Sequence, residues 1–139
     1  MDRQLIEQKL ASLARCVKRV ESRCLVQGSE LSGDLDSQDV AALNLTRAIG
    51  LCVDVALLLI STWGEETPSS MASSFEPLVL RGIITPDMAT ELRHAVGFRN
   101  VIVHNYEAVN WGVVQLVIAS RLALFKDFAA RVMACAQSA

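Results

Sequence analysis

The sequence has little of what marks an exported, membrane-spanning or strongly nucleic-acid-binding protein. It contains no run of like charges and has a formal net charge of −2, so no overall positive field attracts DNA or RNA. Its longest apolar stretch, residues 55–60, is far too short to span a bilayer. The N-terminus opens with the polar Met1-Asp2-Arg3-Gln4, from which we expect no signal peptide and a cytoplasmic location.

Several signatures of catalysis and cofactor binding are also missing. No two of the four cysteines lie close enough for a zinc or redox motif, so we expect them to be reduced. No group of acids or histidines has the spacing of metal ligands, and we expect no metal and no cofactor. Gly28 and Gly33 are too far apart for a phosphate-binding loop, and no Gly-x-Ser-x-Gly elbow occurs.

What the sequence does have is helical periodicity. Apolar residues recur at alternating spacings of four and three, and no segment alternates as a half-buried strand does. Three long helices are predicted from these apolar seams, which cover residues 6–24, 45–63 and 114–132. For the second of them the expected N-cap is Asp36 or Ser37, with Gly64 just past its end.

Two shorter helices and one further cap complete the pattern. The third helix is expected to follow Ser74 as N-cap, with Pro77 in its first turn, where a missing N–H costs nothing. The fourth is predicted to run from Pro86 to near Val103. Asn110 is the expected cap of the last helix. We therefore predict an all-α bundle of about five helices in a single domain, residues 1–139.

The composition also bears on assembly. Hydrophobic residues make up 52% of the chain, more than the core of one small domain needs. The surplus predicts an apolar interface beyond the monomer, and a homodimer is the simplest assembly that covers it.

The candidate for chemistry is the segment 99–106, which contains Arg99, His104 and Tyr106. Arginine is a permanent cation whose planar fork of donors suits phosphate oxygens. Histidine serves as a base or an acid near neutral pH. These are the groups needed to hold a phosphate and move a proton beside it. The plainer interpretation is that the Arg and His satisfy the last carbonyls of a helix, with the Tyr covering the core.

Helical geometry does not by itself aim Arg99 and His104 at one phosphate, because five residues separate their directions by roughly 140°. Either the helix ends near Val103 and His104 turns back, or two chains share the site across a two-fold axis. Asn100 lies on nearly the same face as His104, and a hydrogen bond from it would orient the imidazole ring.

A second set of polar residues lies within the apolar second helix. Asn44, Arg47 and Asp54 fall on one stripe of it, and such groups are costly to bury unpaired. They are predicted either to pair with another helix or to form the opposite wall of a cleft that holds Arg99 and His104.

The order Arg99, four residues, His104, one residue, Tyr106 resembles the signature of HEPN-domain toxins of the HepT type. The flanking sequence is similar too: residues 44–56 look like that family's second helix, and residues 75–84 like its third. Residues 97–106 are similar to the family's most characteristic block, and the resemblance covers about residues 2–132.

The resemblance implies an all-helical homodimer that cleaves RNA without a metal, paired with a minimal nucleotidyltransferase antitoxin. By this resemblance Arg99 and His104 are catalytic, Asn100 is supportive, and Tyr106 accepts AMP from the antitoxin. The expected partners are RNA, the cognate antitoxin and a second copy of the chain, with no DNA and no membrane. The alternatives are a non-catalytic nucleotide- or RNA-binding helical dimer that regulates a partner protein, and a purely structural dimer.

Overall fold

The computed structural model describes residues 2–24 and 30–138, and Gly28 lies outside them. This part of the chain is all-helical and contains no strand. It also contains three short 3-10 turns, η1 (Leu31–Gly33), η2 (Ala72–Ser74) and η3 (Tyr106–Ala108). The predicted all-α class is confirmed. The α-helices are α1 (Arg3–Cys24), α2 (Leu35–Thr62), α3 (Glu76–Leu80), α4 (Pro86–His104), α5 (Trp111–Arg121) and α6 (Ala123–Ser138).

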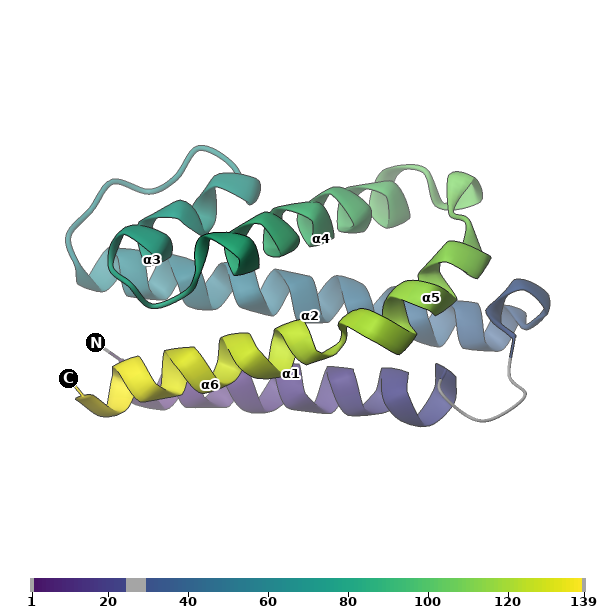
Figure 1. The fold of residues 1–139 in the computed structure, drawn as a ribbon, viewed down its shortest axis with the longest axis horizontal. Coiled ribbons are helices and arrows are strands. Elements are labelled where there is room, and N and C mark those ends of the chain that lie inside the picture. The colour runs from purple at the N-terminus through teal and green to yellow at the C-terminus, as the bar shows by residue number, and fades with distance from the viewer. Residues whose placement is uncertain (1, 25–29, 139) are drawn as a thin grey trace.

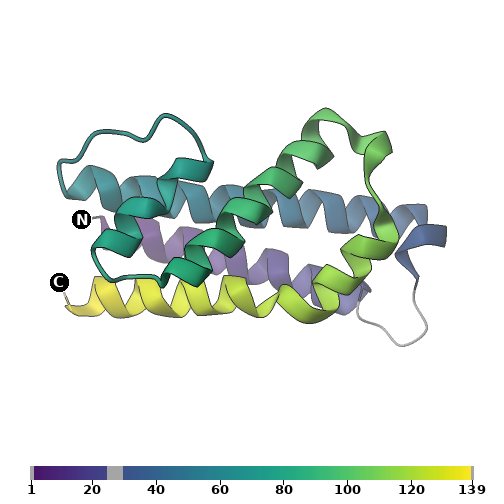
Figure 2. The ribbon, with the colours of Figure 1, turned by 45° about the horizontal axis from the view of Figure 1, so that its top comes forward.

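The long helices α1, α2 and α6 run side by side along the long axis of the molecule, with both chain ends at the same end (Figure 1). Helix α4 lies over α2 and crosses the bundle obliquely, and α5 returns from its far end to α6 (Figure 2). The end of α4 that carries the candidate site is therefore at the opposite end of the molecule from the chain termini.

The predicted seam of the first helix forms one wall of the core, since all six of its members are buried. At the centre, Phe75 and Phe128 are fully buried and meet edge to face, with ring centroids 6.3 Å apart. Helix α2 touches α1, α3, α4 and α6 and is the middle of the bundle. It is long and apolar enough to cross a membrane, but 56% of its most apolar stretch is buried inside the protein, as in the core helix of a bundle.

Two helix starts agree with the sequence. Thr85 caps α4, where its side chain accepts a hydrogen bond from the backbone N–H of Met88. Asn110 caps α5 in the same way through the N–H of Val113.

Two other predicted caps are wrong. Helix α2 begins earlier, because Asp34 is its N-cap and accepts bonds from the backbone N–H and the hydroxyl of Ser37, at 3.1 and 2.7 Å. Ser74 belongs to η2, and its hydroxyl donates to the carbonyl of Ser70 instead of capping α3. The predicted place of Pro77 in the first turn of α3 is confirmed.

The predicted last helix is two helices in the structure, because α5 ends at Arg121 and α6 begins at Ala123. The apolar seam continues unbroken through Ile118, Leu122 and Phe125, which are all buried. Neither proline nor glycine marks the break, so periodicity alone predicted one helix. The break lets α5 pack on η1 while α6 runs along α1.

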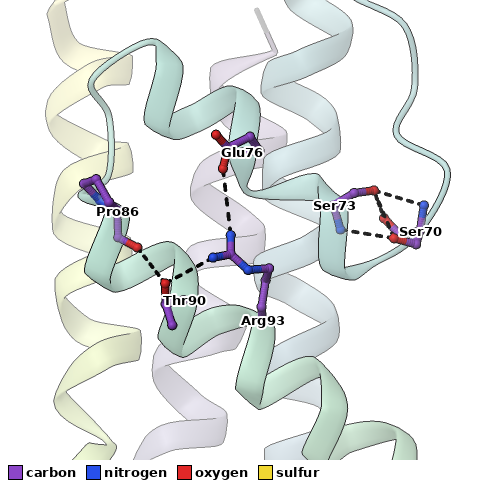
Figure 3. Close-up of polar contacts among 6 residues, drawn as sticks. All are labelled: Ser70, Ser73, Glu76, Pro86, Thr90 and Arg93. Carbon is purple, nitrogen blue, oxygen red and sulfur yellow. Dashed lines mark hydrogen bonds and ion pairs between the residues drawn. The ribbon is translucent and has the colours of Figure 1, made fainter.

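Polar contacts hold the N-terminal half of α4 against α3. The Arg93 guanidinium lies 3.8 Å from the Glu76 carboxylate and donates at 3.1 Å to the Thr90 hydroxyl (Figure 3). That hydroxyl in turn donates to the carbonyl of Pro86. Beside them, Ser70 and Ser73 bond to one another and tie the loop that precedes α3. These contacts fix the start of α4, and its rigid continuation places the candidate site.

We predict that Phe128→Ala lowers the free energy of unfolding by about 3–5 kcal/mol, because it opens a cavity at the centre of the core. Urea unfolding followed by circular dichroism measures the change. Leu80→Ala is the control, since this leucine is 78% exposed and its loss should cost less than about 0.5 kcal/mol. Equal losses in the two variants would contradict this account of the core.

Candidate functional site

The C-terminal end of α4 is helical through His104. The N–H of Asn105 still donates to the carbonyl of Val101 at 2.8 Å, and the chain leaves the helix only at Asn105, with φ −151°. The alternative in which the helix ends before His104 and lets it turn back is therefore wrong. The imidazole of His104 is exposed and makes no hydrogen bond or ion pair with the described residues.

Arg99 projects from a different side of α4. Its direction is within roughly 20° of that of Leu92, which is buried, and the Arg99 side chain is itself half-buried. Its Nη1 donates to Oδ1 of Asn100 at 3.3 Å. Its Nε is buried and has no acceptor within the described chain. A buried N–H without a partner is costly, and this one is left for a rearrangement or a group from outside the chain to satisfy.

The predicted hydrogen bond from Asn100 to the His104 ring is not formed, because the amide oxygen of Asn100 is used by Arg99 instead. The contact has a different consequence for the site. Asn100 and His104 lie on nearly the same face of α4, about 40° apart. The bond therefore draws the guanidinium of Arg99 round the helix toward the side that carries the imidazole.

Tyr106 begins η3, directly after the end of α4. Its hydroxyl donates to Oδ1 of Asp39 on α2 at 2.9 Å, and its ring packs against that of Trp111 with centroids 5.6 Å apart. Burial raises the pKa of Tyr106 to about 12, with further contributions from the hydrogen bond to Asp39 and from the negative charges of Asp39 and Glu107. Tyr106 is the only tyrosine in the sequence.

Sequence reasoning missed Asp39 and Trp111. Asp39 is 67 residues from Tyr106, and no spacing rule connects them. Trp111 carried a weaker signal: it directly follows the cap Asn110, where the chain turns back beside Tyr106. An aromatic residue at that turn is placed to contact a tyrosine on the other side of it.

The polar stripe of α2 faces α1. Asp54 pairs with Lys9 of α1 at 3.4 Å, which confirms the ion-pair interpretation for this residue. Arg47 and Asn44 line a groove of about 360 Å³ between the two helices, which they share with Arg15 and Arg19 of α1. Asn44 is buried and donates to the carbonyl of Val40, but its Oδ1 has no partner among residues 2–24 and 30–138.

These three residues make no hydrogen bond or ion pair with Arg99 or His104 in the part of the chain that the structure describes. The prediction that they form the opposite wall of the site is not met within one chain, because they lie on the side of α2 that packs against α1. The groove that Asn44 and Arg47 line is cationic, since its lining includes three arginines.

An apolar groove of about 440 Å³ lies between α4 and α5, with α2 as its floor. Phe98 lines it from α4, and Val117 from α5. Val113 and Val117 in this lining are 53% and 44% exposed, and Val101 of α4, outside the groove, is 40% exposed. His104 follows Val101 by three residues, so its imidazole lies beside an exposed apolar side chain on α4.

Comparison with known proteins shows which family this chain is similar to. Residues 13–132 match the family model described as ribonuclease HepT-like. The chain is 32% identical over 124 residues to a Shewanella oneidensis protein named mRNA nuclease HepT. The aligned residues cover 89% of this chain and 92% of that protein.

Solved structures give the same result. The tri-AMPylated Shewanella oneidensis HEPN toxin, solved in complex with its MNT antitoxin, matches with a TM-score of 0.88 at 31% identity, over 96% of this chain and 98% of that one. A toxin–antitoxin complex with AMP-PNP matches with a TM-score of 0.88 at 30% identity, over 94% and 98% of the two chains. The Bacillus subtilis protein YutE, described as cytosolic and of unknown function, shares the fold with a TM-score of 0.83 at 17% identity, over 99% and 92%.

We predict that Asp39→Asn lowers the pKa of Tyr106 from about 12 toward the ordinary value of about 10. The reason is that the variant removes a negative charge beside the phenol. Because Tyr106 is the only tyrosine, the near-ultraviolet absorbance of tyrosinate reports it directly. Glu107→Gln, which removes a charge that is not hydrogen-bonded to the phenol, should shift the pKa less. A titration of Asp39→Asn that overlays that of the unsubstituted protein, with helices intact, would exclude the contact.

Proposed function

Because the chain belongs to the HepT-like ribonuclease family, we propose that it is the toxin of a toxin–antitoxin pair, an endoribonuclease that cuts RNA without a metal. We further propose that a minimal nucleotidyltransferase antitoxin silences it by transferring AMP to Tyr106. The observation that carries the proposal is that Arg99, His104 and Tyr106 gather at one end of α4 in a fold that matches an AMPylated toxin along nearly its whole length. We also propose a cytoplasmic location, where a ribonuclease meets its RNA substrate.

The chemistry requires three groups. Cleavage by the ribose 2′-hydroxyl needs a base to take its proton, an acid to protonate the leaving 5′-oxygen, and a cation to hold the phosphate. His104 is the base or the acid, because its imidazole is exposed and free of internal partners. Arg99 stabilises the charge that develops on the phosphate oxygens. The bond from Asn100 holds the guanidinium toward the His104 side of the helix.

One chain supplies a single copy of His104, and a two-fold homodimer supplies two. The apolar groove between α4 and α5, with the exposed Val113 and Val117 in its lining, forms the surface that a second copy covers. Pairing of the two chains across α4 then brings both copies of His104 to one cleft. One then acts as base and the other as acid.

The position of Tyr106 explains the regulation. It follows His104 by two residues, so AMP on its hydroxyl adds an anion at the edge of the cleft. That phosphate competes for Arg99 and repels the RNA backbone. Inhibition then needs no change of fold.

We predict that Arg99→Ala and His104→Ala each reduce RNA cleavage by roughly 10²–10⁴-fold, with the helices intact. Purified protein is assayed on single-stranded RNA in the presence of EDTA, which should leave the rate unchanged. Arg3→Ala is the control, because it removes an exposed arginine at the start of α1, at the opposite end of the molecule from the site. If both alanine variants bound RNA and neither the variants nor the parent cut it, the non-catalytic binding module would be the correct interpretation.

Val117→Glu should convert the dimer to monomers and abolish cleavage together, because it puts a charge on an exposed residue that lines the groove of the proposed interface. Analytical ultracentrifugation gives the assembly state of the same samples used for the cleavage assay. Leu80→Glu is the control, since Leu80 is an exposed apolar residue on α3 that does not line the groove. A monomeric Val117→Glu protein with full activity would rule out a site shared between two copies.

A further inference from the structure

We propose that Asp39 is the base that takes the hydroxyl proton of Tyr106 when this tyrosine accepts AMP. The inference rests on the proposed function, and in particular on nucleotidyl transfer to Tyr106. In this proposal the toxin contributes a catalytic group to its own inactivation. The antitoxin supplies the bound nucleotide, and the toxin supplies both the acceptor hydroxyl and the base.

The contact is of the right kind for this role. The phenol oxygen and Oδ1 of Asp39 are 2.9 Å apart, and the hydroxyl is the donor. Asp39 is exposed on the second turn of α2, and it forms no ion pair with a cation in the described chain. Its carboxylate is therefore able to accept a proton, and it already contacts the Tyr106 hydroxyl, which must lose one.

Packing holds the acceptor in this geometry. The ring of Tyr106 is half-buried and lies against Trp111, with an angle of 58° between the ring planes. Tyr106 and Trp111 flank the short turn η3, so the phenol has little freedom to swing away from α2. The hydroxyl thus stays beside Asp39 at the surface, where a second protein has access to it.

The phenol needs this assistance. The pKa of Tyr106 is raised to about 12, so almost none of it is ionised near neutral pH. A protonated phenol is a weak nucleophile, and an adjacent base is one of the established ways to activate such a group. The same carboxylate that disfavours free tyrosinate accepts the proton as the new bond forms, so that two negative charges never lie side by side.

In the proposed step, AMP passes from ATP to the hydroxyl of Tyr106. The O–H bond of Tyr106 breaks and its proton passes to Oδ1 of Asp39. The phenol oxygen forms a bond to the α-phosphorus of ATP held by the antitoxin. The bond from that phosphorus to the oxygen bridging the β-phosphate breaks, and pyrophosphate leaves with the electron pair. The product is a tyrosyl phosphodiester, and Asp39 returns its proton to water.

A hydrogen bond between two surface residues also serves to tie η3 to α2. The two roles respond differently to substitution. Asparagine keeps the side-chain shape and an oxygen that accepts the hydrogen bond, but it is not a base. Alanine removes both functions. A purely structural contact is therefore rescued by asparagine, and a base is not.

The test uses the full-length chain with the minimal nucleotidyltransferase antitoxin and ATP, and intact-mass spectrometry follows the first AMP added to Tyr106 over time. We expect Asp39→Asn and Asp39→Ala to slow this first addition by roughly 10²-fold or more, with the concentration of ATP for half-maximal rate unchanged. Glu107→Gln, which removes a neighbouring charge but no hydrogen bond, should be modified at close to the parental rate. All three variants should cleave RNA as the parent does before modification.

Each outcome has a distinct meaning. If Asp39→Asn is modified as fast as the parent while Asp39→Ala is slow, the contact has only a structural role and Asp39 is not the base. If both variants are modified at the parental rate, Asp39 has no part in the transfer. If the parent itself takes up no AMP, or takes it up and still cleaves RNA, the proposed function fails instead. Tyr106→Phe, which has no acceptor oxygen, identifies any modification elsewhere on the chain.

Discussion

The continuity of α4 through His104 is the constraint on which the candidate site depends. Along an uninterrupted helix the directions of Arg99 and His104 differ by roughly 140°, and one of them faces the bundle while the other faces solvent. A helix cannot bend to bring them together without losing hydrogen bonds. A site that uses both residues needs the guanidinium to turn round the helix, and its bond to Asn100 is directed that way.

This constraint also explains why the protein is expected to act as a dimer. The helix holds one copy of His104 at a fixed place, and one chain leaves an apolar groove between α4 and α5 open to water. In the proposed dimer, a second copy removes this apolar surface from water and supplies a second His104. The proposal therefore makes the stability of the dimer and the completion of the site depend on the same contact.

Local sequence signals predicted most of the fold and part of the site. Thr85 and Asn110 were recognisable as caps, because each precedes an apolar periodic run and has a side-chain oxygen. Asp34 was missed, because Asp36 and Ser37 offer the same chemistry within three residues and only the backbone decides between them. Periodicity could not predict the break between α5 and α6 at Leu122, because the apolar seam continues across it.

The site shows the same division between local and distant information. Arg99, His104 and Tyr106 are close in sequence and have the residue types that phosphate chemistry needs, and the family resemblance supplied their expected roles. Asp39 is close to Tyr106 only because α2 and the end of α4 pack together, so its role required the structure. If Asp39 is the base that we propose, Tyr106 is activated only in the folded chain, because folding alone brings the two residues together. The proposal therefore predicts that an antitoxin modifies folded toxin in preference to unfolded chain.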